Sequence, residues 1–323
     1  MSGGFRHLQA LGNRINVPIP TDDSGFLGRE CPVEECLGYF KVKPGTGLTG
    51  PGLQCHCPYC GHGGDPNTFW TKEQIEYARS VAMQQIAGAV RRDLKQFEFN
   101  YPARGAFGIG ISMKLKDGPL PAIRYYREQR LETDVVCSSC TLHYSVFGLF
   151  AYCPDCGVHN SLQVLERNLA LVEKQLALAS SLDDAELARH LIEDALENCV
   201  SAFDGFARET CRVRAAKSAD PGRASNLSFQ NISNADSALK RLFSISFAAS
   251  IDAPTWEQAT RGFFKRHLIA HRAGVVDDKY VKEANDPTAV VGRRIAVSPD
   301  EVATVARAVL ALGKGLLDSL PPA

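Results

Sequence analysis

The sequence lacks net charge. It carries 36 lysines and arginines against 36 aspartates and glutamates in 323 residues. A neutral chain is a poor candidate for the class of nucleic-acid-binding proteins that are basic throughout, although neutrality says nothing about local patches. The overall charge therefore disfavours nucleic acid as a partner without excluding it.

Long apolar runs are also missing. No stretch of about 18 apolar residues occurs, and the first twenty residues lack the apolar segment of a secretory signal. With 45% hydrophobic and 22% charged residues, the composition is that of a folded globular chain, which excludes wholesale disorder. We expect a cytoplasmic protein with no membrane partner, organised as about two domains of roughly 150 residues each.

Cysteine is scarce in one half of the chain only. Nine of the 11 cysteines precede residue 160. In a reducing compartment these cysteines are not expected to form disulfides, so their spacing carries the information. Residues 1–70 are also rich in Gly and Pro, which is typical of short strands and tight turns.

The hydrophobic pattern changes near residue 160. Before it, Thr71 and Gln74 mark the start of a helix predicted over about 71–97, and residues 107–136 alternate like strands around an Asp117-Gly118 turn. After it, helices are predicted at about 162–179, 183–217, 235–249, 254–273 and 299–319. The predicted fold class is α+β: small β-rich modules with an intervening helix form residues 1–160, and an all-α bundle forms residues 161–323.

The second cysteine cluster, over about residues 132–160, has the spacing of a metal site. It follows the pattern C-x2-C-x12-C-x2-C, with a Pro-Asp-Cys-Gly turn in its second half. Two such knuckles supply four thiolates for a tetrahedral Zn²⁺. The cluster resembles a zinc ribbon whose ligands are Cys137, Cys140, Cys153 and Cys156.

The first cluster, over about residues 25–65, is looser. A pair of cysteines with a four-residue gap is followed, after a Gly-rich stretch, by the run C-H-C-P-Y-C-G-H. The C-P-Y-C-G knuckle resembles the second half of a zinc ribbon and favours a ligand set of Cys31, Cys36, Cys57 and Cys60. Three spare donors could replace one of these ligands, namely Cys55, His56 and His62.

Four thiolates leave no open position on a metal ion, whereas catalytic zinc keeps one position for water. We therefore expect two structural Zn²⁺ ions that stabilise β units too small to fold by burial alone. A zinc deaminase is excluded, because its His-x-Glu motif does not occur in the sequence. Whether the ribbons bind nucleic acid, bind protein or only hold a hairpin stays open.

The segment RGFFKRHLIAHR, residues 261–272, concentrates positive charge in an otherwise neutral region. It contains four basic side chains, two histidines and no acid. Cations near the end of a helix also stabilise its dipole, which is the structural explanation of the same pattern. The functional explanation makes Arg261, Lys265 and Arg272 contacts to nucleic acid.

Within this segment, Arg266 and His271 form the pattern R-x4-H, and His267 directly follows the arginine. The pattern lies late in an all-helical region and resembles the HEPN superfamily, whose all-α domains dimerise and in many members act as metal-independent endoribonucleases. The resemblance covers roughly residues 183–320. It implies a homodimer that cleaves RNA, as in toxin and phage-defence systems, although some members of the superfamily bind rather than cut.

RNA cleavage without a metal needs a group that moves protons and a cation that stabilises the phosphorane. His271 suits the first role and Arg266 the second, while His267 shares a helix face with His271. On one ideal helix Arg266 and His271 are about 140° apart, so two protomers are expected to complete the site.

The sequence thus predicts a HEPN-type endoribonuclease whose zinc ribbons recognise the target or a regulatory protein partner. The alternative is a non-catalytic zinc-ribbon protein that binds nucleic acid or protein and whose helical domain only dimerises.

Overall fold

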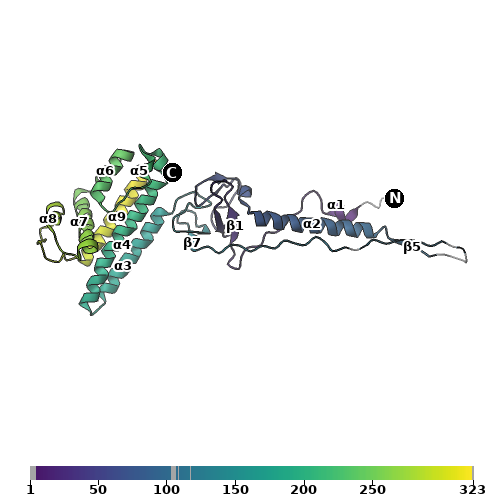
Figure 1. The fold of residues 1–323 in the computed structure, drawn as a ribbon, viewed down its shortest axis with the longest axis horizontal. Coiled ribbons are helices and arrows are strands. Elements are labelled where there is room, and N and C mark those ends of the chain that lie inside the picture. Colours follow the sequence, from purple (N-terminus) through teal and green to yellow (C-terminus); the bar gives the residue numbers. More distant parts are fainter. Residues whose placement is uncertain (1–4, 103–106, 108, 117, 322–323) are drawn as a thin grey trace. The chain divides into compact units, whose positions relative to one another are not determined.

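The computed structural model describes residues 5–102, 107, 109–116 and 118–321. The chain divides into two compact units, Met1–Val158 and His159–Ala323, close to the boundary expected near residue 160. The described strands all lie in the first unit, and the second unit is helical (Figure 1). Among the described residues, no helix is both long enough and apolar enough to cross a membrane.

A four-stranded antiparallel sheet forms the centre of the first unit. Its strand order is β1-β2-β8-β7, with bounds Leu27–Glu30, Tyr39–Val42, His143–Val146 and Thr133–Val136. The central pair joins β2 to β8, so Lys41 lies opposite Ser145 and Val42 lies opposite Tyr144. The two cysteine-rich regions, which the sequence suggested as separate modules, therefore share one sheet and one buried core.

In the sequence, a long helix, α2 (Lys72–Lys95), separates the strand pair β1–β2 from the strand pair β7–β8. It begins where the sequence predicts, because the Thr71 hydroxyl accepts the Gln74 N–H and the Gln74 side chain accepts the Thr71 N–H. The short helix α1 (Arg6–Ala10) lies against α2, where the buried Asp93 carboxylate accepts the N–H groups of His7 and Leu8. The remaining elements of the unit are β3 (Cys55–His56), β4 (Gly63–Gly64), η1 (Pro66–Phe69), β5 (Phe99–Tyr101) and β6 (Ile111–Met113).

The strands predicted over 107–136 occur only in part, as β6 and β7. Residues 119–132 form no strand. Their backbone is instead held by side chains of neighbouring elements, as where the Arg124 N–H donates to the Ser80 hydroxyl on α2 at 2.9 Å. Asp117 lies outside the described residues, and with it the predicted Asp117-Gly118 turn.

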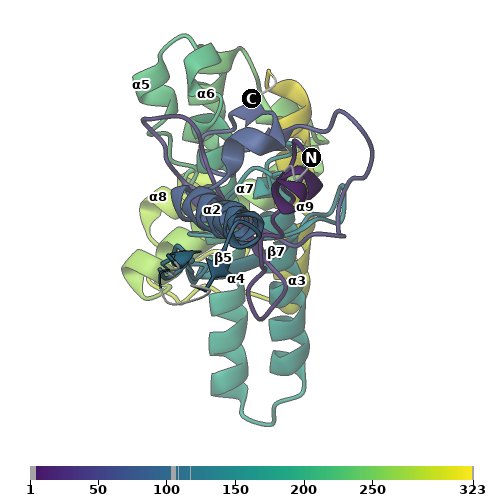
Figure 2. The ribbon, with the colours of Figure 1, turned by 90° about the vertical axis from the view of Figure 1, so that its right-hand side faces the viewer.

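Four long helices build the second unit. They are α3 (Ser161–Ser180), α4 (Ala185–Arg212), α7 (Ala253–Arg272) and α9 (Pro299–Ser319). Helix α4 contacts the other three, and Figure 2 shows it beside α3 as an antiparallel pair. Shorter elements fill the connections: η2 (Ala215–Lys217), α5 (Pro221–Ala224), α6 (Ile232–Phe243), η3 (Phe247–Ala249) and α8 (Asp278–Glu283).

The core of the second unit is organised around a fully buried phenylalanine of α4, Phe203. Its ring lies 5.7–6.3 Å, between centroids, from those of Phe206, Phe229, Phe247 and Phe263. Two buried carboxylates hold the connecting segments against this core: Asp204 accepts the Phe229 N–H and Asp236 accepts the Phe247 N–H, both at 2.6 Å. These bonds hold the segments just before and just after α6 in the connection from α4 to α7.

Candidate metal centres and a candidate pocket on helix α7

The structure brings together four cysteines from each predicted ribbon, with all Sγ atoms of a quartet within 4.8 Å of one another. The quartets are Cys31, Cys36, Cys57 and Cys60, and Cys137, Cys140, Cys153 and Cys156. Individual Sγ–Sγ separations are 3.5–3.7 Å. A tetrahedral site with metal–sulfur bonds of about 2.3 Å has edges of about 3.8 Å. Both quartets therefore have the size of a site that could hold one metal ion.

All four knuckles share two backbone features. In each, the N–H of the first cysteine donates to the carbonyl two residues beyond the second cysteine, as from Cys137 to Leu142 at 2.9 Å. In each, the residue directly after the second cysteine also has a left-handed φ, with values of 45° at Leu37, 64° at Thr141, 75° at Gly61 and 69° at Gly157. Leu37 and Thr141 are not glycine, so each adopts this left-handed conformation at a steric cost that the surrounding turn must offset.

The two ribbons are linked reciprocally through their second knuckles. The His56 N–H donates to the Pro154 carbonyl at 2.7 Å, and the Tyr152 N–H donates to the Pro58 carbonyl at 2.9 Å. Each donor directly precedes the first cysteine of its knuckle, and each acceptor directly follows that cysteine in the other knuckle. Together with the central β2–β8 pairing, these bonds identify the ribbons as two copies of one structural unit.

The three spare donors lie outside the first quartet. Cys55 is buried in β3, and burial raises the pKa of its thiol to about 12 despite the nearby Arg29. The exposed His62 ring lies 6.2 Å from Phe69, between centroids, and His56 Nδ1 has no hydrogen-bond partner in the described part of the chain. Of the alternatives that the sequence left open, the geometry favours Cys57 and Cys60 as the second pair of candidate ligands.

The R-x4-H motif forms the last turns of α7, but the structure separates its two ends. Arg266 is only 8% exposed, and its Nη1 donates to Gln230 Oε1 at 2.8 Å. His271 is exposed, and its ring lies 4.8 Å from that of His267, between centroids. The two histidines are thus neighbours on one face, while the arginine points into the interior of its unit.

The predicted nucleic-acid contacts differ in their positions. Lys265 is buried, and its Nζ donates to Glu301 at 2.7 Å and to the Ala296 carbonyl at 2.9 Å, so its predicted contact with nucleic acid is incompatible with its burial. Arg261 donates to the Asn285 carbonyl at 2.8 Å and is likewise engaged within the unit. Only Arg272 is exposed and available to a ligand.

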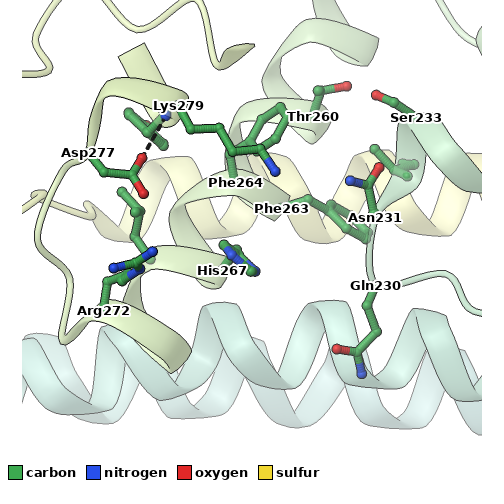
Figure 3. Close-up of a pocket in the computed structure, with 13 residues that line it drawn as sticks. Gln230, Asn231, Ser233, Thr260, Phe263, Phe264, His267, Arg272, Asp277 and Lys279 are labelled. Carbon is green, nitrogen blue, oxygen red and sulfur yellow. Dashed lines mark hydrogen bonds between the residues drawn. The ribbon is translucent and has the colours of Figure 1, made fainter. Parts of the chain in front are cut away.

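A pocket of about 200 Å³ lies along one face of α7 (Figure 3). Helix α7 contributes a row of side chains at three- and four-residue steps, namely Thr260, Phe263, Phe264, His267 and Leu268. Residues 230–233, around the start of α6, close one end of the pocket, and Arg272, Asp277, Lys279 and Tyr280 close the other. In Figure 3, His267 lies between these two ends.

His267 is the electrostatic centre of the pocket. Burial lowers the pKa of its imidazole, the neighbouring His271, Lys279 and Arg266 lower it further, and Asp277 opposes the shift. The imidazole is therefore neutral at neutral pH and able to accept a proton. A neutral proton acceptor beside cations is an arrangement suited to chemistry on an anionic substrate.

Several pocket residues were not identified from the sequence. Lys279 and Asp277 lie in or next to α8, whose six residues are too short to produce a periodic pattern. Thr260 has a buried Oγ1 that lacks a hydrogen-bond partner within the described ranges. Asn231 caps α6 by accepting the Asn234 N–H at 2.9 Å, and a capping role is all that its sequence context could have indicated.

Comparison with protein-family models, with curated protein sequences and with solved structures finds no significant match to this chain. The two quartets and the α7 pocket are therefore the features of the chain that bear on its function.

Proposed function

We propose that both cysteine quartets bind Zn²⁺ and that the helical unit is a HEPN-type, metal-independent endoribonuclease. Four thiolates in a tetrahedral set match the preference of zinc, and such a closed site serves structure rather than catalysis. When bound, each ion would hold two knuckles of the shared sheet. The ribonuclease proposal depends on the α7 pocket and not on the metal.

One observation carries the ribonuclease proposal, the pairing of His267 and His271 beside exposed cations. Their rings are 4.8 Å apart, and Arg272 and Lys279 line the same pocket as His267. Two adjacent imidazoles supply a proton acceptor and a proton donor, and the cations stabilise the charge that develops on a phosphate.

The proposed reaction uses the ribose 2′-hydroxyl as nucleophile. Neutral His267 accepts its proton, O2′ forms a bond to the adjacent phosphorus, and the bond from phosphorus to O5′ breaks. His271, in its protonated form, gives a proton to O5′. The products are a 2′,3′-cyclic phosphate and a 5′-hydroxyl. Arg266 is then a positioning residue that acts through Gln230.

A homodimer through the helical unit remains part of this proposal, because the R-x4-H motif resembles that of dimeric HEPN proteins. A second protomer would bring a second histidine pair and further cations to the RNA. The zinc-bound sheet would contribute target recognition or a surface for a regulatory partner. The setting of toxin or phage defence rests on the resemblance to the HEPN superfamily alone.

The burial of Arg266 favours the alternative, a non-catalytic zinc-ribbon protein that binds nucleic acid or protein and whose helical domain only dimerises. An arginine that grips the scissile phosphate must reach the substrate, and this one donates inward to Gln230. If the alternative holds, His267 and His271 have no catalytic role.

The full, zinc-loaded chain can be tested on fluorescent single-stranded RNA without added divalent metal. EDTA is added at a level that leaves the bound zinc intact, as checked by metal analysis. We expect His267→Ala and His271→Ala each to lower the cleavage rate constant by about 100-fold or more. The matched control is His190→Ala, an exposed histidine on α4, which should leave the rate unchanged.

Mass spectrometry of the products should show the cyclic phosphate. Equal rates for wild type and both histidine variants would overturn the catalytic assignment. RNA that is bound but left intact by the wild type would establish the binding-only alternative.

A further inference from the structure

The α7 pocket has two chemically different ends, joined by an apolar middle. Arg272 and Lys279 present two cationic groups at one end, beside the single carboxylate of Asp277, and His267 lies between the two ends. Thr260 and Asn231, together with Ser233, present uncharged polar groups at the other (Figure 3). The walls between these ends are formed by Phe263, Phe264, Ile232 and Leu268. A ligand that matches this order has an anionic group, then a flat apolar body, then a polar edge.

The size of the pocket restricts that ligand. Its volume of about 200 Å³ is below the roughly 300–1,000 Å³ of pockets that enclose drug-sized molecules. One planar ring system fits such a space, whereas a dinucleotide does not. The rest of a longer ligand would have to lie outside.

The polar end holds unsatisfied hydrogen-bonding groups. Thr260 Oγ1 is buried and has no partner among the residues that the structure describes. The carbonyl oxygen of the Asn231 side chain caps α6, which leaves its amide N–H groups for a ligand. Gln230 differs, because its amide already contacts Arg266 and Asp204. Thr260 and Asn231 are therefore the side chains that could distinguish one polar edge from another.

We infer that this pocket binds a single unpaired nucleobase, with the adjacent phosphate held by Arg272 and Lys279. The inference rests on the proposed ribonuclease function and adds a base preference to it. Phe263 and Phe264 provide the apolar surface for the ring, and Thr260 and Asn231 read its edge. A base stacked in a duplex cannot enter, so the substrate class is single-stranded RNA with a preferred base at the cleavage site.

The inference can be tested by binding, without any cleavage. The four nucleoside 3′-monophosphates are titrated against the full, zinc-loaded chain by calorimetry. We expect one of them to bind about 5-fold more tightly than the others, which is the value of one hydrogen bond between neutral groups. Thr260→Val keeps the shape of the side chain and removes the hydroxyl, and it should reduce this preference to less than about 2-fold.

A second variant distinguishes loss of a contact with the base from loss of the fold. Asn231→Asp keeps the oxygen that caps α6 and removes the amide donor, so the helix should persist while the preference falls. The control is Ser237→Ala, an exposed position on α6 outside the pocket. Equal affinities for all four nucleotides, or dissociation constants weaker than roughly 10 mM for each, would overturn the base pocket even if RNA is cleaved. A base preference abolished by Thr260→Val in a protein that cleaves no RNA would support the pocket and defeat the ribonuclease.

Discussion

The two units bury their interiors with different chemistry. In the first, six of the 13 residues of the buried cluster are cysteines, and the central sheet has strands of only four residues. In the second, phenylalanines and aliphatic side chains from four long helices form a continuous apolar core. The first unit can therefore gain little from hydrophobic burial and much from bonds to a metal, whereas the second resembles an ordinary helical protein in its source of stability.

Metal removal should have the largest effect and should affect the first unit only. Structural zinc sites contribute on the order of 10 kcal/mol to folding, so chelation or Cys153→Ser should unfold the sheet and leave the helical unit folded. Because the chain has one tryptophan in each unit, Trp70 and Trp256, single Trp→Phe variants let fluorescence follow each unit alone. Metal analysis of the intact protein should find two zinc ions per chain.

The control for this experiment is Cys55→Ala, which removes a buried cysteine outside both quartets and should retain both ions. A protein isolated with no zinc, or a Cys153→Ser variant that keeps both ions, would contradict the assignment of the first unit as metal-stabilised.

Loss of a core ring should destabilise the second unit and leave the first unit unchanged. Phe203→Ala removes the side chain around which four other rings pack, and such truncations cost about 3–5 kcal/mol. We expect the urea midpoint of the Trp256 transition to fall, while the first unit keeps both metal ions. Leu187→Ala on α4 is the matched control, because Leu187 is 49% exposed and should change stability little. A parallel loss of metal in Phe203→Ala would mean that the two units do not unfold independently.

The sequence predicted the elements of both units better than their assembly. Cysteine spacing identified both quartets, and periodicity located α2, α3, α7 and α9, because these signals are local. The pairing of β2 with β8 joins segments about a hundred residues apart through strands of four residues, and such short strands carry no register signal. The sequence also did not reveal that the two ribbons share one structure, because α2 and its neighbours separate them along the chain.

The candidate site shows the same limit. The motif identified Arg266 by residue type alone. The helical spacing also places Arg266 on the buried face of α7, in line with Ala259, Gly262 and Phe263. A charged residue in that row is expected to be held by a buried partner. Gln230, which supplies that partner, lies in a connecting segment that no periodic pattern could place.

Removal of a helix cap should have the smallest effect, and the two units each offer one cap for comparison. Thr71 in the first and Ser298 in the second each begin a helix with a capping box. Replacement of either residue by alanine should cost about 1 kcal/mol. The cap of α2 is buried and Gln74 also donates to the Gly28 carbonyl at 2.9 Å, whereas the cap of α9 is exposed to water, which can replace the lost oxygen. We therefore expect the larger loss for Thr71→Ala, measured as the urea midpoint of the Trp70 transition, and an equal or larger loss for Ser298→Ala would show that burial around α2 does not amplify its cap.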